Sequence, residues 1–195
     1  MESFSHDKIF FTSDLHAFHA NIIGQFNRPF ASIKKMNRHI ISQWNSVVPE
    51  DGVVIDCGDV SMKTESQNLW WFLGQLNGLH ILILGNHDKV HELPQDCFAG
   101  IYEQLIFTVT GDEAMPDKII HACHYPMLSW YQDRKGSFHI YGHTHQNDAL
   151  GTHEELIGKM GKNCLNVGVD NCDFKPLSWR DFKAKMALHN KLFVY

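Results

Sequence analysis

Short runs of apolar, β-branched and aromatic residues recur along the chain and are separated by more polar segments. Several runs end in Gly, Asp or Asn, which favour the turn that follows a strand. The runs that predict strands are Ile9–Thr12, Val53–Cys57, Leu79–Leu84, Gln104–Thr110, Ile119–Ala122, Phe138–Tyr141 and Leu165–Val169.

Three segments instead have apolar residues at the three-to-four spacing of an amphipathic helix. They are Ser32–Val48, which Pro49 ends, a segment from about Thr64 to Leu76, and a segment from Ser178 to about Leu188. Thr64 with Gln67, and Ser178 with Asp181, have the spacing of a capping box, which indicates a helix start.

The order of these elements predicts a mixed α/β architecture. Strands alternate with helices in the first half, which favours parallel pairing, whereas turns alone separate the runs between Gln104 and Val169, which favours antiparallel pairing. Because no repeat, low-complexity tract or long linker interrupts the pattern, we expect one domain over residues 1–195.

Composition narrows the class of protein. A chain of 195 residues with 44% hydrophobic residues can bury a sizeable core, which excludes intrinsic disorder. No membrane-spanning run or secretory signal is present in the sequence, so we expect a cytoplasmic protein without a membrane partner. The net charge of −5 argues against binding of extended duplex nucleic acid, and the five cysteines lack a C-x-x-C pair, which favours reduced thiols.

The chain has 14 histidines, and many of them follow the predicted strands. The carboxyl ends of strands are where open α/β sheets collect ligands, so these side chains could converge. The metal-capable residues at these ends are Asp14, His16, Asp59, Asn86, His124, His143 and His145, and His87 and Asp88 lie beside them.

Each of these short motifs has an ordinary alternative, a hydrogen-bonded core histidine or a turn-forming aspartate. Five strand ends that all carry such residues are harder to explain in that way. Carboxylates and imidazoles crowded together without a cation would be destabilised by desolvation and repulsion. The sequence therefore predicts a metal centre, and imidazoles with carboxylate and amide oxygens suit Mn²⁺, Fe or Zn²⁺ better than Mg²⁺ or Ca²⁺.

The ordered set Asp14-Leu15-His16, Gly58-Asp59, Gly85-Asn86-His87-Asp88, His124 and Gly142-His143-Thr144-His145 resembles the calcineurin-like metallophosphoesterase superfamily. The resemblance implies a four-layer sandwich of two mixed β-sheets flanked by helices. It also implies two divalent ions, with Mn²⁺ expected and Fe, Zn²⁺ or Ni²⁺ as alternatives. Asp14, His16, Asp59 and His145 would hold one ion, Asp59, Asn86, His124 and His143 the other, and Asp59 would bridge them.

On this basis we expect a phosphohydrolase that cleaves a phosphodiester or phosphomonoester, with a nucleotide among the candidate substrates. A metal-bound hydroxide would attack phosphorus, and His87 would protonate the leaving alkoxide. Asp88 would orient the His87 ring, although a role as a turn cap is the alternative.

Other residues are candidates for contact with a substrate. His19 and Asn21 would touch the substrate or a nearby water, and Arg28 would clamp a phosphate, with a surface role as the alternative. Phe18, Phe26, Phe30, Trp70 and Trp71 could stack on a nucleobase or pack in the core, so no role is assigned to them. The helix Ser32–Val48 resembles an insertion that roofs the site.

Two other functions stay open. One is a nuclease or RNA-end-processing phosphoesterase with the same centre, and the other is a metal-binding scaffold without activity. The second block lacks the GDxVDRG pattern of phosphoprotein phosphatases, which argues against a Ser/Thr protein phosphatase. A small-molecule or terminal phosphoester is therefore the expected substrate, and nothing in the sequence indicates an oligomeric state.

Overall fold

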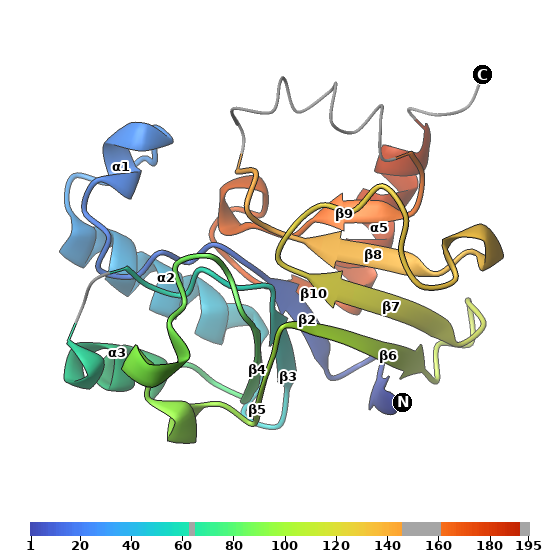
Figure 1. Cartoon of the computed structure of the whole chain (residues 1–195), viewed down its shortest axis with the longest axis horizontal. Helices are drawn as coiled ribbons and strands as arrows, with labels where there is room; N and C mark the ends of the chain where they lie inside the picture. Colours follow the sequence, from blue (N-terminus) through green and yellow to red (C-terminus); the bar gives the residue numbers. More distant parts are fainter. Residues whose placement is uncertain (63–64, 146–160, 192–195) are drawn as a thin grey trace.

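The computed structural model describes residues 1–62, 65–145 and 161–191, which form two five-stranded sheets and several helices (Figure 1). Sheet A has the order β1 (Glu2–Ser5), β6 (Gln104–Thr110), β7 (Lys118–Cys123), β8 (Phe138–Tyr141) and β9 (Cys164–Asn166). Sheet B has the order β10 (Leu177–Ser178), β2 (Ile9–Thr12), β3 (Val53–Asp56), β4 (Leu79–Ile83) and β5 (Gly100–Tyr102). The helices are α1 (Ile22–Gln25), α2 (Ile33–Val47), α3 (Ser66–Leu73) and α5 (Trp179–Lys191).

Both sheets are mixed, which confirms the predicted α/β class with two mixed β-sheets. In sheet B, β2 to β5 run parallel and β10 pairs antiparallel with β2. In sheet A the expected antiparallel pairing is found between β6 and β7, but it is wrong for β7 with β8 and for β8 with β9, which are parallel. The connection 124–137 is long enough for a crossover that returns the chain to the same end of the sheet, although it holds only a turn of 3₁₀ helix, Asp133–Lys135.

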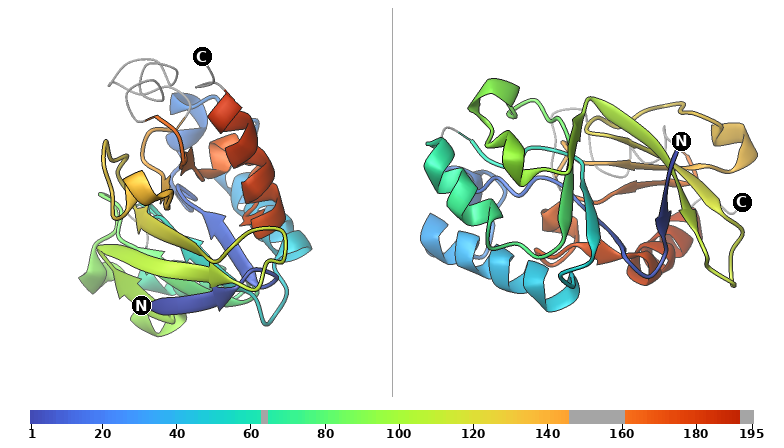
Figure 2. Two further views of the ribbon diagram at one scale, coloured as in Figure 1. Left: turned by 90° about the vertical axis from the view of Figure 1, so that its right-hand side faces the viewer. Right: turned by 90° about the horizontal axis from the view of Figure 1, so that it is seen from below.

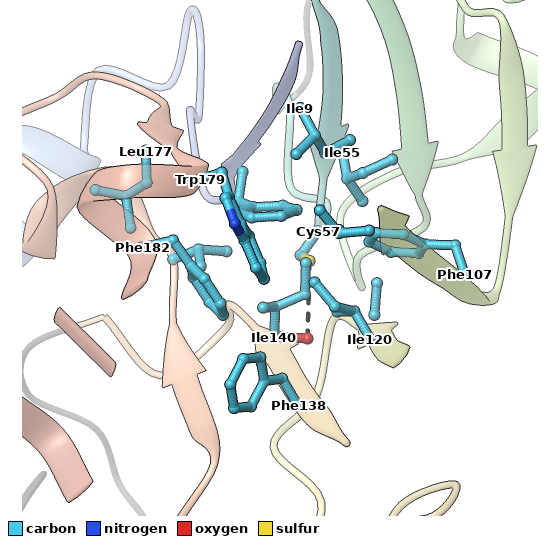
Figure 3. Packing of buried hydrophobic residues seen from close by; sticks show 14 of the residues in the cluster. Ile9, Ile55, Cys57, Phe107, Ile120, Phe138, Ile140, Leu177, Trp179 and Phe182 are labelled. Carbon is cyan, nitrogen blue, oxygen red and sulfur yellow. Dashed lines mark hydrogen bonds between the residues drawn. The ribbon is translucent and has the colours of Figure 1, made fainter. Parts of the chain in front are cut away.

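The two sheets pack against each other across a core of aliphatic and aromatic side chains (Figure 3). Alternation along β6 directs Leu105, Phe107 and Val109 into this core while their neighbours lie partly exposed. The Cys57 thiol of sheet B faces the Ile140 carbonyl oxygen of sheet A at 3.8 Å, which marks how closely the layers approach.

Helices α2 and α3 cover the face of sheet B that points away from sheet A (Figure 2). The apolar stripe of α2, with Met36, Ile40 and Trp44, belongs to the same buried cluster as Val54 and Leu82 of the sheet. Sheet B is therefore buried on both faces, which explains why its strands are continuous apolar runs. The expectation that Ser32–Val48 roofs the site is wrong, because its buried face packs on the sheet.

Helix α5 packs against β10 and β9, which are edge strands of the two sheets. It contributes Trp179, Phe182 and Met186 to the core between the sheets. The Ser178 hydroxyl accepts a hydrogen bond from the Asp181 amide at 3.2 Å, so the predicted capping pair is present. No described helix is long and apolar enough to cross a lipid bilayer.

Several boundaries differ from the prediction. The Leu165–Val169 run is strand only as β9, Cys164–Asn166, and Val169 begins a 3₁₀ turn. Helix α3 begins after Glu65, which makes no side-chain cap, and Thr64 lies outside the described residues. The short elements β1, β5, β10 and α1 were not expected from the sequence.

Candidate metal centre

The loops that follow β2, β3, β4, β7 and β8 meet at one end of the sandwich. Together they bring the seven predicted donors to one place, where a cavity of about 490 Å³ opens between them and the segment around α1. The wall on the donor side includes His16, Asp59, Asn86, His143 and His145. The arrangement arises because the parallel strands of both sheets present their carboxyl ends on the same side.

Three of the donors form a buried group around the Asp14 carboxylate. One atom from each of Asp14, His16 and His145 lies within 4.8 Å of the others. The Asp14 oxygen Oδ1 is 3.9 Å from His16 Nε2 and 3.7 Å from His145 Nε2. A divalent cation that bonds each atom at about 2.0–2.2 Å could lie between atoms at these separations without large movement.

The Asp59 carboxylate lies among the rings of His16, His87 and His124. Its Oδ2 is 3.6 Å from Nε2 of His16 and 3.6 Å from Nε2 of His124. Asp14, Asp59 and His124 form a second group within 4.8 Å. Asp14 therefore belongs to both groups, which the resemblance did not imply.

Asn86 completes this side of the site. Its side-chain oxygen Oδ1 is 3.0 Å from His124 Nε2 and 2.9 Å from His143 Nδ1. The amide oxygen and both rings therefore point at one another, beside the Asp59 carboxylate.

The hydrogen bonds of the rings indicate what these nitrogens need. His124 Nδ1 lies 2.7 Å from the Cys57 carbonyl oxygen, and His145 Nδ1 lies 2.7 Å from Asp170 Oδ2, so each Nδ1 carries the proton it donates. In the neutral rings, Nε2 then presents a lone pair to the oxygens of Asn86 or Asp14. Two acceptor atoms that face each other repel, and a cation between them removes that repulsion.

His16 supplies the most direct sign. Its Nε2 is buried and, within the described residues, has no hydrogen-bond partner. An unsatisfied buried nitrogen costs about 1–3 kcal/mol. This orphaned atom faces the Asp14 and Asp59 carboxylates, so the residues present fit a divalent cation.

Electrostatics agrees with crowded, desolvated donors. Burial raises the pKa of Asp14 to about 6, against the opposing effect of His145 and His124. Burial, with His145 next in importance, lowers the pKa of His16 well below its usual range. The neutral imidazole that a metal requires is thus the favoured form of His16.

The backbone is strained at the donors. Five of them, although not glycine, adopt a left-handed conformation, with φ of 58° at Asp14, 49° at His16, 57° at Asp59, 68° at His143 and 46° at His145. Such conformations cost of order 1 kcal/mol or more each and persist where surrounding contacts impose them. These backbone conformations direct five side chains from three loops toward the same site.

Two glycines allow this close approach. A Cβ at Gly85 would collide with the carboxylate and amide of Asp59, and a Cβ at Gly142 would collide with Ser13 and with the Asp14 carboxylate. The absence of a side chain at these two positions is therefore what lets the loops from β4 and β8 lie against Asp59 and Asp14.

Asp88 does not have the role expected for it. Its carboxylate accepts hydrogen bonds from the amides of Asp59 at 2.7 Å, Val60 at 3.1 Å and Gly85 at 2.9 Å, rather than from the His87 ring. Burial raises the pKa of Asp88 to about 6 despite these donors. The side chain connects the loops after β3 and β4 by hydrogen bonds. This is the alternative role of a turn cap, here with amides of two loops.

Arg28 is also placed differently from the phosphate clamp that the sequence suggested. Its guanidinium is buried, makes a bidentate pair with Asp170 at 2.8 and 2.7 Å, and donates to the carbonyls of Asp14 at 2.8 Å and Leu15 at 3.0 Å. With these donors engaged inside the protein, Arg28 supports the first ligand loop instead of reaching the cavity.

Asp170 is a residue of the candidate site that sequence reasoning missed. It receives both the Arg28 guanidinium and His145 Nδ1, so it fixes the ring that faces Asp14. Although burial raises its pKa, the bond from His145 and the charge of Arg28 outweigh that effect and lower it. The available signal was its place directly after a predicted strand, where the other site residues lie.

The remaining predicted residues border the cavity. His87 is one-third exposed, with Nε2 3.9 Å from Asp59 Oδ2, and its amide donates to Asp59 Oδ1 at 2.9 Å. His19 and Asn21 also line the cavity, and His19 Nδ1 lies 3.4 Å from His16 Nδ1. Phe26, to which no role was assigned, stacks on His145 with centroids 3.9 Å apart and planes at 16°.

The chain is similar in sequence to several proteins and in fold to a solved structure. No family model matches the chain. The protein named Uncharacterized protein MJ1445, from Methanocaldococcus jannaschii, is 33% identical over 172 residues, which cover 88% of this chain and 86% of that protein. Gene 66 protein of Mycobacterium phage L5 is 26% identical over 185 residues, covering 82% of this chain and 85% of that protein. A crystal structure of the protein of unknown function AQ665 from Aquifex aeolicus matches with a TM-score of 0.66 and 26% identity, over 91% of this chain and 98% of that one.

Proposed function

This chain belongs to the family of the Methanocaldococcus jannaschii protein MJ1445, and we propose that it is a metal-dependent phosphoesterase of the calcineurin-like type. One observation carries the proposal. Seven nitrogen and oxygen donors from five strand ends converge around the orphaned His16 Nε2, with His87 exposed beside them. Carboxylates, an amide oxygen and imidazoles without a thiolate are the donor set of a dinuclear hydrolytic centre.

In this proposal the donors divide between two divalent ions. Asp14, His16, Asp59 and His145 hold one, and Asp59, Asn86, His124 and His143 hold the other, with Mn²⁺ expected and Fe, Zn²⁺ or Ni²⁺ as alternatives. When bound, such ions neutralise charge on phosphoryl oxygens and lower the pKa of a water toward neutrality.

The chain's own side chains would orient the substrate and move one proton. His87 Nε2 faces the cavity beside Asp59, and its main chain is held by the Asp59 carboxylate. A proton on His87 Nε2 would pass to the leaving alkoxide oxygen as the P–O bond breaks. His19 and Asn21, which line the same cavity, would contact the substrate.

The size of the cavity favours a small or terminal phosphoester. Its volume of about 490 Å³ lies within the range of small-molecule sites, roughly 300–1,000 Å³. The net charge of −5 argues against a long duplex. A nuclease that acts on an end of RNA stays an alternative within the same chemistry.

The test begins with metal analysis. Protein stripped with a chelator and reloaded with Mn²⁺ is expected to bind two ions per chain and to hydrolyse bis-p-nitrophenyl phosphate or p-nitrophenyl phosphate. The ratio of the two rates would assign diester or monoester preference. Two bound ions without turnover for any of Mn²⁺, Zn²⁺, Fe²⁺ and Ni²⁺ would favour an inactive scaffold, and absence of bound ions would overturn the metal centre itself.

A further inference from the structure

A second cavity lies beside α2, outside the candidate metal centre. Its volume is about 330 Å³, and its walls include the apolar side chains of Phe18, Ile33, Ile41 and Trp71 and the basic side chains of Lys34 and Arg38. We name it the helix cavity. Trp71 is 54% exposed, which leaves part of the indole accessible to a ligand.

A third cavity lies between the helix cavity and the metal centre. A smaller cavity of about 210 Å³ shares Phe18 with the helix cavity, and it shares His19, Asn21 and Met62 with the central cavity. The three cavities are therefore neighbours, in an order that leads from the donors past His19 to Phe18. The Phe18 ring is held in place, since it packs edge-on against Phe72 at 5.9 Å and its amide donates to Asn37 at 3.4 Å.

The charge of the helix cavity differs from that of the whole chain. Helix α2 has Lys34, Lys35 and Arg38 and no acidic residue, although the net charge of the protein is −5. Lys34 and Arg38 are four residues apart and so lie on the same face of the helix. Neither takes part in an ion pair with the described residues. The cavity thus combines aromatic faces with two cations.

We propose that the helix cavity binds the base of a nucleotide while a phosphoester of the same molecule lies at the metal centre, an inference that rests on the proposed function. The Trp71 and Phe18 rings supply faces on which a base stacks. Lys34 and Arg38 are hydrogen-bond donors for the acceptor atoms of the base. An acyl chain would use the apolar walls but would gain nothing from the two cations, so the nucleotide accounts for more of the structure.

The test compares three esters with one chromophoric leaving group: thymidine 5′-(p-nitrophenyl phosphate), methyl p-nitrophenyl phosphate and octyl p-nitrophenyl phosphate. We expect kcat/KM for the thymidine ester to exceed that for the methyl ester. Trp71→Leu is expected to lower this ratio about tenfold, within the range of a lost base stack. Trp70→Leu is the matched control, because Trp70 is 58% exposed on the same helix but does not line the cavity, and it is expected to keep the wild-type ratio.

The basic residues have their own matched pair. Lys34→Gln is expected to lower the thymidine-to-methyl ratio, whereas Lys35→Gln, one residue along α2 and outside the cavity, is expected to preserve it. Equal ratios in the wild type, Trp71→Leu and Lys34→Gln proteins would overturn the proposal. A preference for the octyl ester that Trp71→Leu removes would also overturn it, in favour of an acyl substituent.

Binding separates this inference from the proposed function. If no ester is hydrolysed, the phosphoesterase proposal fails, but the cavity is still tested by calorimetry with AMP and with ribose 5-phosphate. We expect AMP to bind about tenfold tighter than ribose 5-phosphate, and Trp71→Leu to remove that difference. Equal affinity of the two probes for the wild-type protein would overturn the nucleotide assignment.

Discussion

Among the described residues, the buried histidines of sheet A and those at the strand ends have ring nitrogens that face different partners. His121 and His139, on strands β7 and β8 of sheet A, have every ring nitrogen paired. His139 Nδ1 lies 2.9 Å from the His121 carbonyl oxygen, and its Nε2 accepts from the Met127 amide at 3.2 Å. At the strand ends, by contrast, His16 Nε2 has no partner among the described residues.

The difference teaches how to distinguish a structural histidine from a candidate ligand. Burial does not separate the groups, because His139 and His124 are both fully buried. Satisfaction of the ring does, since His139 has one donor and one acceptor partner, whereas the second nitrogen of His124 points at oxygens. A ring that leaves a lone pair aimed at carboxylates is one that a cation completes.

The largest test of this contrast is the removal of the central charge. Asp59→Asn is expected to lose both ions and all measurable hydrolysis, because Asp59 would contribute to each ion. Metal content by mass spectrometry and hydrolysis of bis-p-nitrophenyl phosphate measure this. His139→Gln, in the other group, is expected to retain wild-type metal content. Retention of two ions by Asp59→Asn would refute the bridging role.

The second test separates catalysis from metal binding within the site. His87→Ala is expected to keep both ions but to lower kcat by about 10²–10⁴-fold, the usual size of a general-acid contribution. His91→Ala is the control, since His91 lies four residues away with its side chain 79% exposed. An unchanged rate for His87→Ala would remove His87 from the mechanism.

A smaller effect is expected where a neighbour fixes a candidate ligand. Asp170→Asn removes the charge that holds His145 Nδ1 and Arg28, so metal affinity is expected to fall about 10–100-fold. A chelator competition measures the affinity. Asp173→Asn changes an exposed aspartate in the same loop and is expected to leave affinity unchanged. Equal affinities of the two variants would show that Asp170 does not position His145.

The smallest effect is expected for the paired histidines, and it concerns how the free energy of unfolding depends on pH. Burial lowers the pKa of His139 to about 4, from its ordinary 6.5, so between these values the unfolded chain binds more protons than the folded one. The free energy of unfolding therefore falls as pH drops from 7 to 5, by about 2 kcal/mol from this residue.

His139→Gln keeps an acceptor for the Met127 amide but cannot take up the proton. Urea unfolding at pH 7 and pH 5 is expected to show a smaller loss of stability for His139→Gln than for the wild type. The same loss in both proteins would show that His139 is not responsible.

The sequence predicted those parts of the fold that burial dictates. Strands β2, β3 and β4 and helix α2 were expected close to their observed bounds, because burial imposes continuous apolar runs on these strands and an apolar period on the helix. Edge strand β1 was missed because its residues are mostly exposed and have no such period. The parallel pairing of β7 with β8 was missed because the crossover between them contains no α-helix to reveal it.

The same division holds for the site. The donors could be identified because each follows a strand in a short polar motif, and the structure brings them together. The contacts of Arg28 and Asp88 could not, because they depend on partners far away in the chain. Asp170 pairs with Arg28 across 142 positions, and Asp88 reaches the Asp59 amide across 29, so only the folded geometry assigns these side chains.

The hydrogen bonds of Arg28 connect parts of the site that lie far apart in the sequence. The guanidinium connects the segment after α1, the carbonyls beside the first donor and the carboxylate behind His145. A displacement of that segment would therefore be transmitted to two loops on opposite sheets at once. In the proposed function, a ligand in the cavity and the metal ions would therefore be coupled through Arg28, and each would change the affinity for the other by the same factor.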